Sequence, residues 1–355
     1  MINILELEAS KGWGGQEKRT VRVVNGLDKS RFRVFYGVHK DSELMKHKEQ
    51  IDAIMLELPI SKSYNLIELY KVIKAVKKYK INIISTHSSK DAWIGAIAGK
   101  LTGVKVIRVR HLQLSINSPL SYNLSSRVTA VCNSVKEHLV SRGVKSEKID
   151  VIYSGRDMSL YTPDIIYNLR SEIDAQNDEI LIGIVAVLRA QKRHTLLLEA
   201  LAKLPANCKV VIIGEGPQDA NIRIAIKELG VKKRVYMLGH REDVAQILPS
   251  LDIFVLPSIM EAIGGSAIEA SACGLPIVVS HVGGLPEVVL DGESGYLFEP
   301  DNLDSLVEKL ELLIESKERR EAFGKRGREY VLEKFHIQKM IEDTQRQYEL
   351  VTEKV

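Results

Sequence analysis

The sequence predicts an α/β protein with two doubly wound, Rossmann-like domains that face a cleft. Three observations carry this prediction. Short apolar runs alternate with helical stretches along most of the chain, which is typical of parallel sheets covered by helices on both faces. A length of 355 residues is too great for one ordinary hydrophobic core. The alternation is interrupted once, by a polar stretch at residues 156–178, and then restarts.

The elements divide into an N-terminal domain, residues 1–155, and a C-terminal domain, residues 179–336, with the polar stretch as linker. In order, we expect strands at residues 2–7, 34–38, 81–85, 104–109, 127–131 and 149–153, then at 180–188, 209–213, 235–238, 253–256, 277–280 and 292–298. We expect helices at residues 16–27, 65–80, 91–101 and 135–142, then at 195–204, 220–229, 243–251, 266–273, 303–314 and 319–335.

The last segment, residues 337–355, is amphipathic and has no strand of its own to cover. A helix with one apolar face must bury that face against another element. We therefore expect this helix to cross back and pack on the N-terminal domain.

The composition predicts a soluble cytoplasmic protein. Hydrophobic residues make up 45% and charged residues 27% of the chain, no apolar run reaches the length of a membrane span, and the first residues do not resemble a signal peptide. Cys132, Cys208 and Cys273 are odd in number, scattered, and lack metal-ligand spacing. We expect each to be a small buried residue in a reducing compartment.

The net charge of +4 hides an asymmetry between the two halves. Residues 1–150 hold 26 basic and 14 acidic residues, a net +12, whereas the remainder holds 24 and 32, a net −8. We expect the first half to meet an anionic membrane surface rather than nucleic acid, through Lys71, Lys74, Lys77, Lys78 and their neighbours. A plainly solvated helix face is the competing interpretation.

Residues 252–276 are the stretch around which the chain is organised. An apolar strand leads through Gly264 and Gly265 into a helix of small residues, so backbone N–H groups and a positive dipole end are offered to an anion. Two carboxylates, Glu261 and Glu269, lie eight residues apart and suit sugar or ribose hydroxyls better than phosphate. The alternative is that both are solvated charges.

This stretch resembles the E-x7-E segment of the retaining nucleotide-sugar glycosyltransferases of family 4, which have the GT-B fold. The resemblance covers nearly the whole chain and is strongest from residue 180 to 300. It implies that Glu269 binds the ribose of the donor and Glu261 the hydroxyls of the transferred sugar. It also implies that Gly264, Gly265 and Ser266 face the donor diphosphate.

Basic residues follow the first strand of the second domain. Arg189 and Lys192 stand where the family has the pair that binds the donor pyrophosphate, although without the resemblance a solvated charge run is the better interpretation of them. Arg193 stands where the family often has glycine, so its role is open. Gly239 follows a later strand, where a turn suits the base and ribose or is an ordinary connection.

Candidate residues in the first domain are fewer. Gly14 and Gly15 form a weak dinucleotide-type turn, which in the resembled family lies over the donor diphosphate and the acceptor. His111 ends a strand where the family places a functional histidine near the transferred sugar, although a lone histidine is more often structural. His87 and Trp13 are weaker candidates for contact with the acceptor.

One departure from the family lies at residues 153–157, which read Tyr-Ser-Gly-Arg-Asp where Asn-Gly-Val-Asp is usual. It puts in doubt any role assigned to this segment from the resemblance.

The resemblance implies a retaining hexosyl- or heptosyltransferase that moves a sugar from a nucleoside-diphosphate sugar to an acceptor hydroxyl. The acceptor is expected in lipopolysaccharide, lipid-linked or other surface glycan synthesis at the inner face of the cell membrane. A nucleotide-sugar epimerase of GT-B fold and a non-catalytic nucleotide-sugar-binding protein are the alternatives. We expect no cofactor and no metal, because the chain contains no Asp-x-Asp pair and the diphosphate charge can be met by basic residues.

Overall fold

The structure is a computed structural model that describes residues 1–353. Contacts between Cα atoms divide it into two compact units. Unit 1 comprises Met1–Gly155 together with the C-terminal segment from Ile337, and unit 2 comprises Arg156–His336. The stretch expected as a linker, residues 156–178, belongs to unit 2 and contains the short helix α7 (Leu169–Glu172). The last two residues of the expected C-terminal helix lie outside the described residues.

Unit 1 is built on a seven-stranded parallel sheet, which confirms the predicted doubly wound arrangement. The strands lie in the order β3-β2-β1-β4-β5-β6-β7. Their bounds are β1 (Ile2–Glu8), β2 (Phe32–Val38), β3 (Ile54–Glu57), β4 (Ile83–Thr86), β5 (Lys105–Arg110), β6 (Arg127–Ala130) and β7 (Ile149–Val151). The strand order reverses between β1 and β4, so the space beyond their carboxyl ends is the switch point where ligands bind in such sheets.

The helices within Met1–Gly155 are α1 (Gly15–Gly26), α2 (Glu43–Lys46), α3 (Leu66–Lys78), α4 (Ser89–Thr102), α5 (Leu120–Leu124) and α6 (Asn133–Ser141). The sequence supplies clear caps for α3 and α4. The side chain of Asn65 accepts hydrogen bonds from the first backbone N–H groups of α3. Gly103 ends α4 in the left-handed conformation that glycine adopts without strain.

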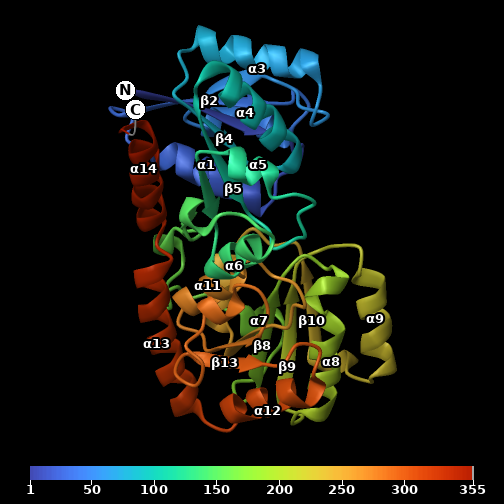
Figure 1. Cartoon of the computed structure of the whole chain (residues 1–355). Coiled ribbons are helices and arrows are strands. Elements are labelled where there is room, and N and C mark those ends of the chain that lie inside the picture. The colour runs from blue at the N-terminus through green and yellow to red at the C-terminus, as the bar shows by residue number, and fades with distance from the viewer. Residues whose placement is uncertain (354–355) are drawn as a thin grey trace. The chain divides into compact units, whose positions relative to one another are not determined.

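The C-terminal helix α14 (Ile337–Glu353) packs on unit 1, as the sequence predicted. Met340, Tyr348 and Val351 join the buried cluster that contains Phe32 of β2 and Val24 of α1. Figure 1 shows α14 beside α1. A segment more than 300 residues away from β1 along the chain thus helps to close the core around it.

Unit 2 is built on a six-stranded parallel sheet in the order β10-β9-β8-β11-β12-β13. Its strands are β8 (Ile180–Val185), β9 (Cys208–Ile213), β10 (Val235–Gly239), β11 (Ile253–Leu256), β12 (Ile277–Ser280) and β13 (Gly295–Phe298). Its longer helices are α8 (His194–Lys203), α9 (Asp219–Glu228), α11 (Gly265–Ala272), α12 (Leu303–Ile314) and α13 (Lys317–Lys334). The order reverses between β8 and β11, which is therefore the switch point of this unit.

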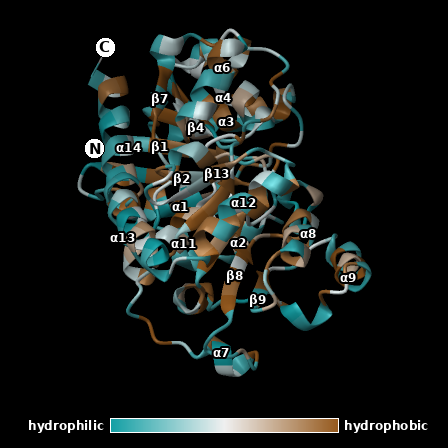
Figure 2. Cartoon of the chain, turned by 90° about the horizontal axis from the view of Figure 1, so that it is seen from below, coloured by the Kyte–Doolittle hydropathy of each residue, from teal (hydrophilic) through white to brown (hydrophobic). Residues whose placement is uncertain are grey.

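The strands of unit 2 are apolar because helices cover the sheet. In Figure 2 the strand β8 is mostly brown, hydrophobic, while α13 carries hydrophilic teal residues. All four residues of β11 and all four of β12 are buried. This explains why continuous apolar runs, rather than alternating ones, marked these strands in the sequence.

Several elements differ from the sequence prediction. The short helices α2 and α5 and the strand β3 were not predicted, and β3 is a four-residue edge strand that is only partly buried. The helix expected at residues 243–251 is only α10 (Val244–Ile247) followed by a 3₁₀ turn that contains Pro249. Proline lacks the N–H that a longer helix would need. Within residues 1–353, no helix is long and apolar enough to cross a membrane.

Candidate functional site

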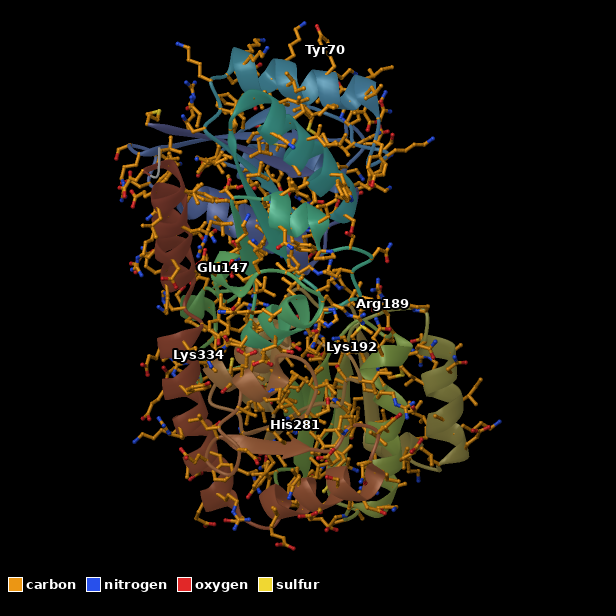
Figure 3. The ribbon with its side chains drawn as sticks, in the orientation of Figure 1. Tyr70, Glu147, Arg189, Lys192, His281 and Lys334 are labelled. Carbon is orange, nitrogen blue, oxygen red and sulfur yellow. The ribbon has the colours of Figure 1, made fainter. Side chains whose placement is uncertain are left out.

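The switch point of unit 2 brings together the basic and acidic residues that the sequence singled out. Arg189 and Lys192 follow β8, and Glu261 follows β11, its neighbour in the sheet. The Lys192 ammonium forms an ion pair with the Glu261 carboxylate. The N–H of Ile259 donates to the Gln191 carbonyl at 2.9 Å, which ties the two loops together. Figure 3 shows Arg189 and Lys192 at the same end of unit 2.

Arg189 differs from Lys192 in its surroundings. It is exposed, and its side chain makes no hydrogen bond or ion pair within the described part of the chain. Lys192 is held by Glu261, and its side chain is 20% exposed. Arg189 is therefore available for an anionic ligand, whereas Lys192 must release the Glu261 carboxylate before it can bind one.

The turn into α11 requires glycine. Gly264 has φ +71°, and a Cβ there would lie 2.3 Å from the Leu285 side chain. Gly264 caps α11, and Gly265 is its first residue. The first N–H groups of a helix have no partner within it, so this end can bind an anion. The structure thus places Gly264, Gly265 and Ser266 beside the loops that carry the basic residues.

Arg156 is a site residue that the sequence reasoning missed. Its Nε donates to Glu269 Oε1 at 2.7 Å, and the two side chains are 13% and 17% exposed. A Cβ added to Gly265 would lie 1.8 Å from an Arg156 guanidinium nitrogen, so this guanidinium lies against the first residue of α11. The departure at residues 153–157 was the available signal, because it puts a cation where the resembled family usually has valine.

Both carboxylates of the E-x7-E segment are therefore paired with cations of unit 2. Glu261 contacts Lys192, and Glu269 contacts Arg156. Partly buried ion pairs of this kind have well-defined geometry, and removing one partner leaves the other uncompensated. The expectation that the carboxylates are simply solvated does not fit these contacts.

Arg193 and Gly239 have local roles. Arg193 has φ +51°, caps α8 and forms an ion pair with Asp301. A left-handed residue explains why glycine is common at this position in the resembled family. Gly239 ends β10 with φ +67°, and the N–H of His240 donates to Glu215 Oε1 at 3.3 Å. This turn follows β10, at the edge of the sheet, rather than the switch-point strands β8 and β11.

In unit 1 the structure brings the two predicted histidines together. His87 follows β4 and His111 follows β5, and the His87 Nδ1 and His111 Nε2 atoms are 3.0 Å apart. His87 Nε2 lies 2.7 Å from Glu6 Oε2 on the neighbouring strand β1. Glu6 is 1%, His87 7% and His111 8% exposed. These side chains form a buried chain at the switch point of this sheet.

Burial and charge shift the pKa values of these groups in opposite directions. For His87, burial lowers the pKa, but the hydrogen bond and charge of Glu6, with the charges of Glu8 and Asp91, outweigh it, and the net pKa is raised. Burial, together with the charge of His87 and of nearby arginines, holds the pKa of His111 well below its ordinary value. At neutral pH His111 is therefore an uncharged imidazole.

The remaining candidates of unit 1 lie at the start of α1. Gly14 caps this helix, and its N–H donates to Glu17 Oε2 at 2.8 Å, whereas Gly15 faces open space. Thr20 of α1 reaches His87 Nδ1 at 3.4 Å, so this helix borders the histidine pair. Trp13 stacks on His47, with ring centroids 4.3 Å apart.

Each of the two units matches a known protein family. Residues 13–160 match the family described as Glycosyltransferase Family 4, and residues 167–330 match the family described as Glycosyl transferases group 1. The chain is 27% identical to the N-acetyl-alpha-D-glucosaminyl L-malate synthase of Bacillus anthracis, over 81% of this chain and 78% of that protein. It is 29% identical to the UDP-Gal:alpha-D-GlcNAc-diphosphoundecaprenol alpha-1,3-galactosyltransferase of Escherichia coli, over 71% and 70% respectively.

The fold has close counterparts among solved structures. The crystal structure of Anabaena Alr3699/HepE in complex with UDP superposes with a TM-score of 0.89 at 23% identity, covering 98% of this chain and 100% of that one. Such a similarity at this identity establishes the architecture of both units.

Proposed function

Since this chain belongs to glycosyltransferase family 4 and acts as a glycosyltransferase on nucleotide-sugar donors, we propose that it is a retaining, metal-independent hexosyl- or heptosyltransferase. The acceptor is a hydroxyl of a lipid-linked, lipopolysaccharide or other surface glycan. The observation that carries this proposal is the switch point of unit 2, where Arg189, Lys192 and the α11 N-terminus converge beside Glu261.

The names of the relatives support the choice of substrates. The Escherichia coli relative is named for a UDP-galactose donor and an acceptor carried on diphosphoundecaprenol. The structure of Alr3699/HepE was determined with UDP. Uridine diphosphate sugars are accordingly the first donors to test, and lipid-linked glycans the first acceptors.

The chemistry follows from charge. When the bond between the sugar and the diphosphate breaks, negative charge grows on the diphosphate oxygens. Arg189 and Lys192 can bond those oxygens, and the first N–H groups of α11 add a positive dipole end. Interactions that strengthen as this charge grows accelerate the reaction rather than merely tightening substrate binding.

The carboxylates of Glu261 and Glu269 are suited to bind the uncharged part of the donor. Carboxylate oxygens accept hydrogen bonds from hydroxyl groups, so Glu269 suits the ribose and Glu261 the transferred sugar. When the diphosphate binds Lys192, Glu261 exchanges an ammonium partner for sugar hydroxyls. Donor binding is thus coupled to the rearrangement of an existing ion pair.

The proposal needs no divalent ion because the chain itself supplies the positive charge. Arg189 and Lys192 contribute two full charges, and a helix N-terminus contributes about half of one. Arg156 adds a third cation beside Gly265. These groups can together offset the charge that a metal would otherwise neutralise.

We further propose that unit 1 associates peripherally with the cytoplasmic face of an anionic membrane. Exposed apolar residues gather at the start of α3, with Tyr64 68%, Leu66 78%, Ile67 70% and Tyr70 65% exposed. Lys71, Lys74, Lys77 and Lys78 of the same helix are exposed as well. Figure 3 shows Tyr70 on the outer side of α3. Apolar residues flanked by lysines suit an anionic lipid surface.

A screen of nucleotide sugars tests the function. The protein is incubated with each donor, with and without lipid-linked acceptors, and mass spectrometry follows donor loss, free nucleoside diphosphate and glycosylated product. We expect nucleoside diphosphate and product to appear together. Epimerised donor formed without any acceptor, or binding without turnover of any donor, would overturn the proposal.

A further inference from the structure

A chain of buried polar groups runs from the C-terminal helix to His111 inside unit 1. The hydroxyl of Tyr348 donates to Glu6 Oε1 at 3.0 Å, and Glu6 Oε2 lies 2.7 Å from His87 Nε2. His87 Nδ1 lies 3.0 Å from His111 Nε2. Tyr348, Glu6, His87 and His111 are all less than 10% exposed. The chain joins one helix and three neighbouring strands, which differ widely in sequence position.

The geometry restricts where the protons can be. Glu6 accepts from Tyr348 with one oxygen, and an ionised carboxylate accepts from His87 with the other, so His87 carries a proton on Nε2. Between the two rings, one nitrogen must donate and the other accept. If His87 is an imidazolium, its Nδ1–H donates to His111 Nε2, and the proton of a neutral His111 must lie on Nδ1.

We propose that Glu6 and His87 are positioning residues that hold His111 as a neutral hydrogen-bond donor through Nδ1. The proposal rests on the proposed function for its catalytic consequence, but not for the proton positions themselves. A fixed hydrogen-bond partner at one ring nitrogen of a histidine decides which of the two nitrogens carries the proton.

The charges around the pair favour this state. Burial raises the pKa of Glu6, but the hydrogen bond and charge of His87, with bonds from Ser85 and Tyr348, outweigh it, so Glu6 is ionised. The other ionisable groups that face the cluster are Glu8, Arg19, Tyr36, Asp91 and Arg110. Glu8 and Asp91 stabilise charge on His87, while Arg19 and Arg110 oppose charge on His111.

The cluster also excludes bulk water. A cavity of about 10 Å³ lies beside it and is lined by residues including Glu6, His87 and Tyr348. That volume is at the lower limit for a single water molecule. The cavity is therefore too small for a chain of water molecules.

The arrangement gives His111 a specific chemical role. As an oxygen of a ligand bound at the switch point of unit 1 gains negative charge, the bond from His111 Nδ1–H to it strengthens. If that proton moves onto the oxygen, the proton between the rings can pass from His87 Nδ1 to His111 Nε2, which leaves His87 neutral beside Glu6. One proton leaves and the cluster loses one positive charge. His111 thus acts as a donor in this state, not as a general base.

Nitrogen-15 NMR of histidine-labelled protein tests the proton positions without any assay of activity. At about pH 6, below the ordinary pKa of histidine, His87 should show both ring nitrogens protonated, and His111 should show Nδ1 protonated and Nε2 bare. Variants His87→Gln and His111→Gln assign the signals. His194 is buried in unit 2, with a pKa lowered to about 4 by burial and Lys192, and serves as a neutral internal reference.

Perturbing the cluster should move these signals in a defined way. Glu6→Gln removes the charge that holds the His87 proton, so His87 should become neutral and His111 should shift toward protonation on Nε2. Tyr348→Phe removes a hydrogen bond that stabilises the Glu6 carboxylate, so Glu6 should attract the His87 proton more strongly and the pH at which His87 loses this proton should rise. Tyr122→Phe is the matched control, because Tyr122 is buried in unit 1 and its hydroxyl has no partner among the described residues.

Kinetics extend the test to function. In the wild type, kcat should fall as pH rises through the raised pKa of His87. This limb should move to higher pH in Tyr348→Phe but not in Tyr122→Phe. Glu6→Gln should lower kcat by about 10²-fold with a smaller effect on KM. A structural role alone would lower the amount of folded protein without moving the pH profile.

Two results would overturn the proposal. One is a wild-type His111 protonated on Nε2 at about pH 6, or a neutral His87 at that pH. The other is a pH profile identical in wild type and Tyr348→Phe. If no nucleotide sugar is turned over at all, the proposed function fails while the NMR result still decides the proton positions.

Discussion

At the scale of single residues, both carboxylates of the proposed donor site in unit 2 already have cationic partners. Glu269 lies in an ion pair with Arg156, whose guanidinium also contacts Gly265. The sequence pattern indicated Glu269, whereas Arg156 was marked only by the departure from the family at residues 153–157. The pairing of the two could not be predicted, because they are 113 positions apart and only the fold brings them together. Side-chain pairs of this kind leave no periodic signal.

The Arg156–Glu269 pair leads to a prediction for nucleotide binding. Glu269→Ala should weaken binding of a nucleoside diphosphate by roughly 1.5–3 kcal/mol for each charged hydrogen bond lost. Arg156→Ala should weaken binding of the diphosphate more than binding of the nucleoside, because its cation lies at the end of α11. Isothermal titration calorimetry with UDP and uridine measures both.

The control for this prediction is Arg193→Ala. Arg193 is a nearby arginine whose ion pair is with Asp301 and not with the E-x7-E carboxylates. It should leave the affinity for UDP within a few tenths of a kcal/mol of the wild type, as most surface substitutions do. Equal losses for uridine and UDP in Arg156→Ala would show that Arg156 only holds Glu269.

Arg189 and Lys192 should affect turnover more than folding. Each is expected to contact charge that develops as the diphosphate leaves, so Arg189→Ala and Lys192→Ala should each lower kcat by about 10²–10³. Steady-state kinetics with thermal melting as the folding control measures this. Because Lys192 neutralises Glu261 in the free protein, Lys192→Gln gives a second estimate with the shape of the side chain better preserved. Near wild-type kcat in both alanine variants is incompatible with the assigned role.

At the scale of elements, continuous apolar runs gave the strands of both sheets because these strands are buried on both faces. The edge strand β3 was not predicted; it is only four residues long and partly exposed. The turn into α11 was predictable because glycine in the left-handed region is a strong local signal.

The helix α3 carries the prediction of membrane binding. Replacing Lys71, Lys74, Lys77 and Lys78 with glutamine should abolish flotation with anionic vesicles at low salt, since each lysine near such a surface contributes about 1 kcal/mol. Replacing the exposed Leu66 and Ile67 with serine should weaken flotation at both low and high salt.

The control is a basic cluster of unit 2. Lys227, Lys232 and Lys233 lie in and after α9, and their replacement with glutamine should leave flotation unchanged. Equal recovery of the wild type at low and high salt, or with zwitterionic vesicles, would show that the charge of α3 is not what binds.

At the scale of the whole molecule, both sheets, their parallel strands and the return of α14 to unit 1 were predictable from sequence. The amphipathic pattern of α14 predicted that its apolar face packs against another element, but it did not predict which side chains make the contact. The bond between Tyr348 and Glu6 joins positions 342 residues apart, and only the assembled core reveals it. The contact between the buried side chains of His87 and His111 is likewise visible only in the folded structure.

The buried acidic groups of unit 1 predict how stability varies with pH. Burial and the charge of Asp91 raise the pKa of Glu8 from 4.5 to about 7. Folding therefore favours the protonated form, and the contribution of Glu8 to stability is present below pH 4.5 and is lost as pH rises through about 7. Glu8→Gln should remove this loss while still accepting the bond from the N–H of Ser10.

Chemical denaturation between pH 4.5 and 8 measures the effect. The variant should gain stability over the wild type as pH rises, at up to about 1.4 kcal/mol for each unit of pKa shift, and the gain should level off above pH 7. Glu137→Gln, on the exposed side of α6, is the control and should show no such trend. A stability difference that is constant across the range contradicts the raised pKa.

The central claim is that the cations of the chain itself, and no divalent metal, carry the charge of the departing diphosphate. The most direct test is the initial rate of sugar transfer from the preferred donor by metal-stripped protein in excess EDTA. We predict a rate close to that without EDTA in the wild type, and a fall of about 10²–10³ in Lys192→Ala under the same conditions. A fall to background in the wild type that added Mg²⁺ or Mn²⁺ restores would contradict the claim.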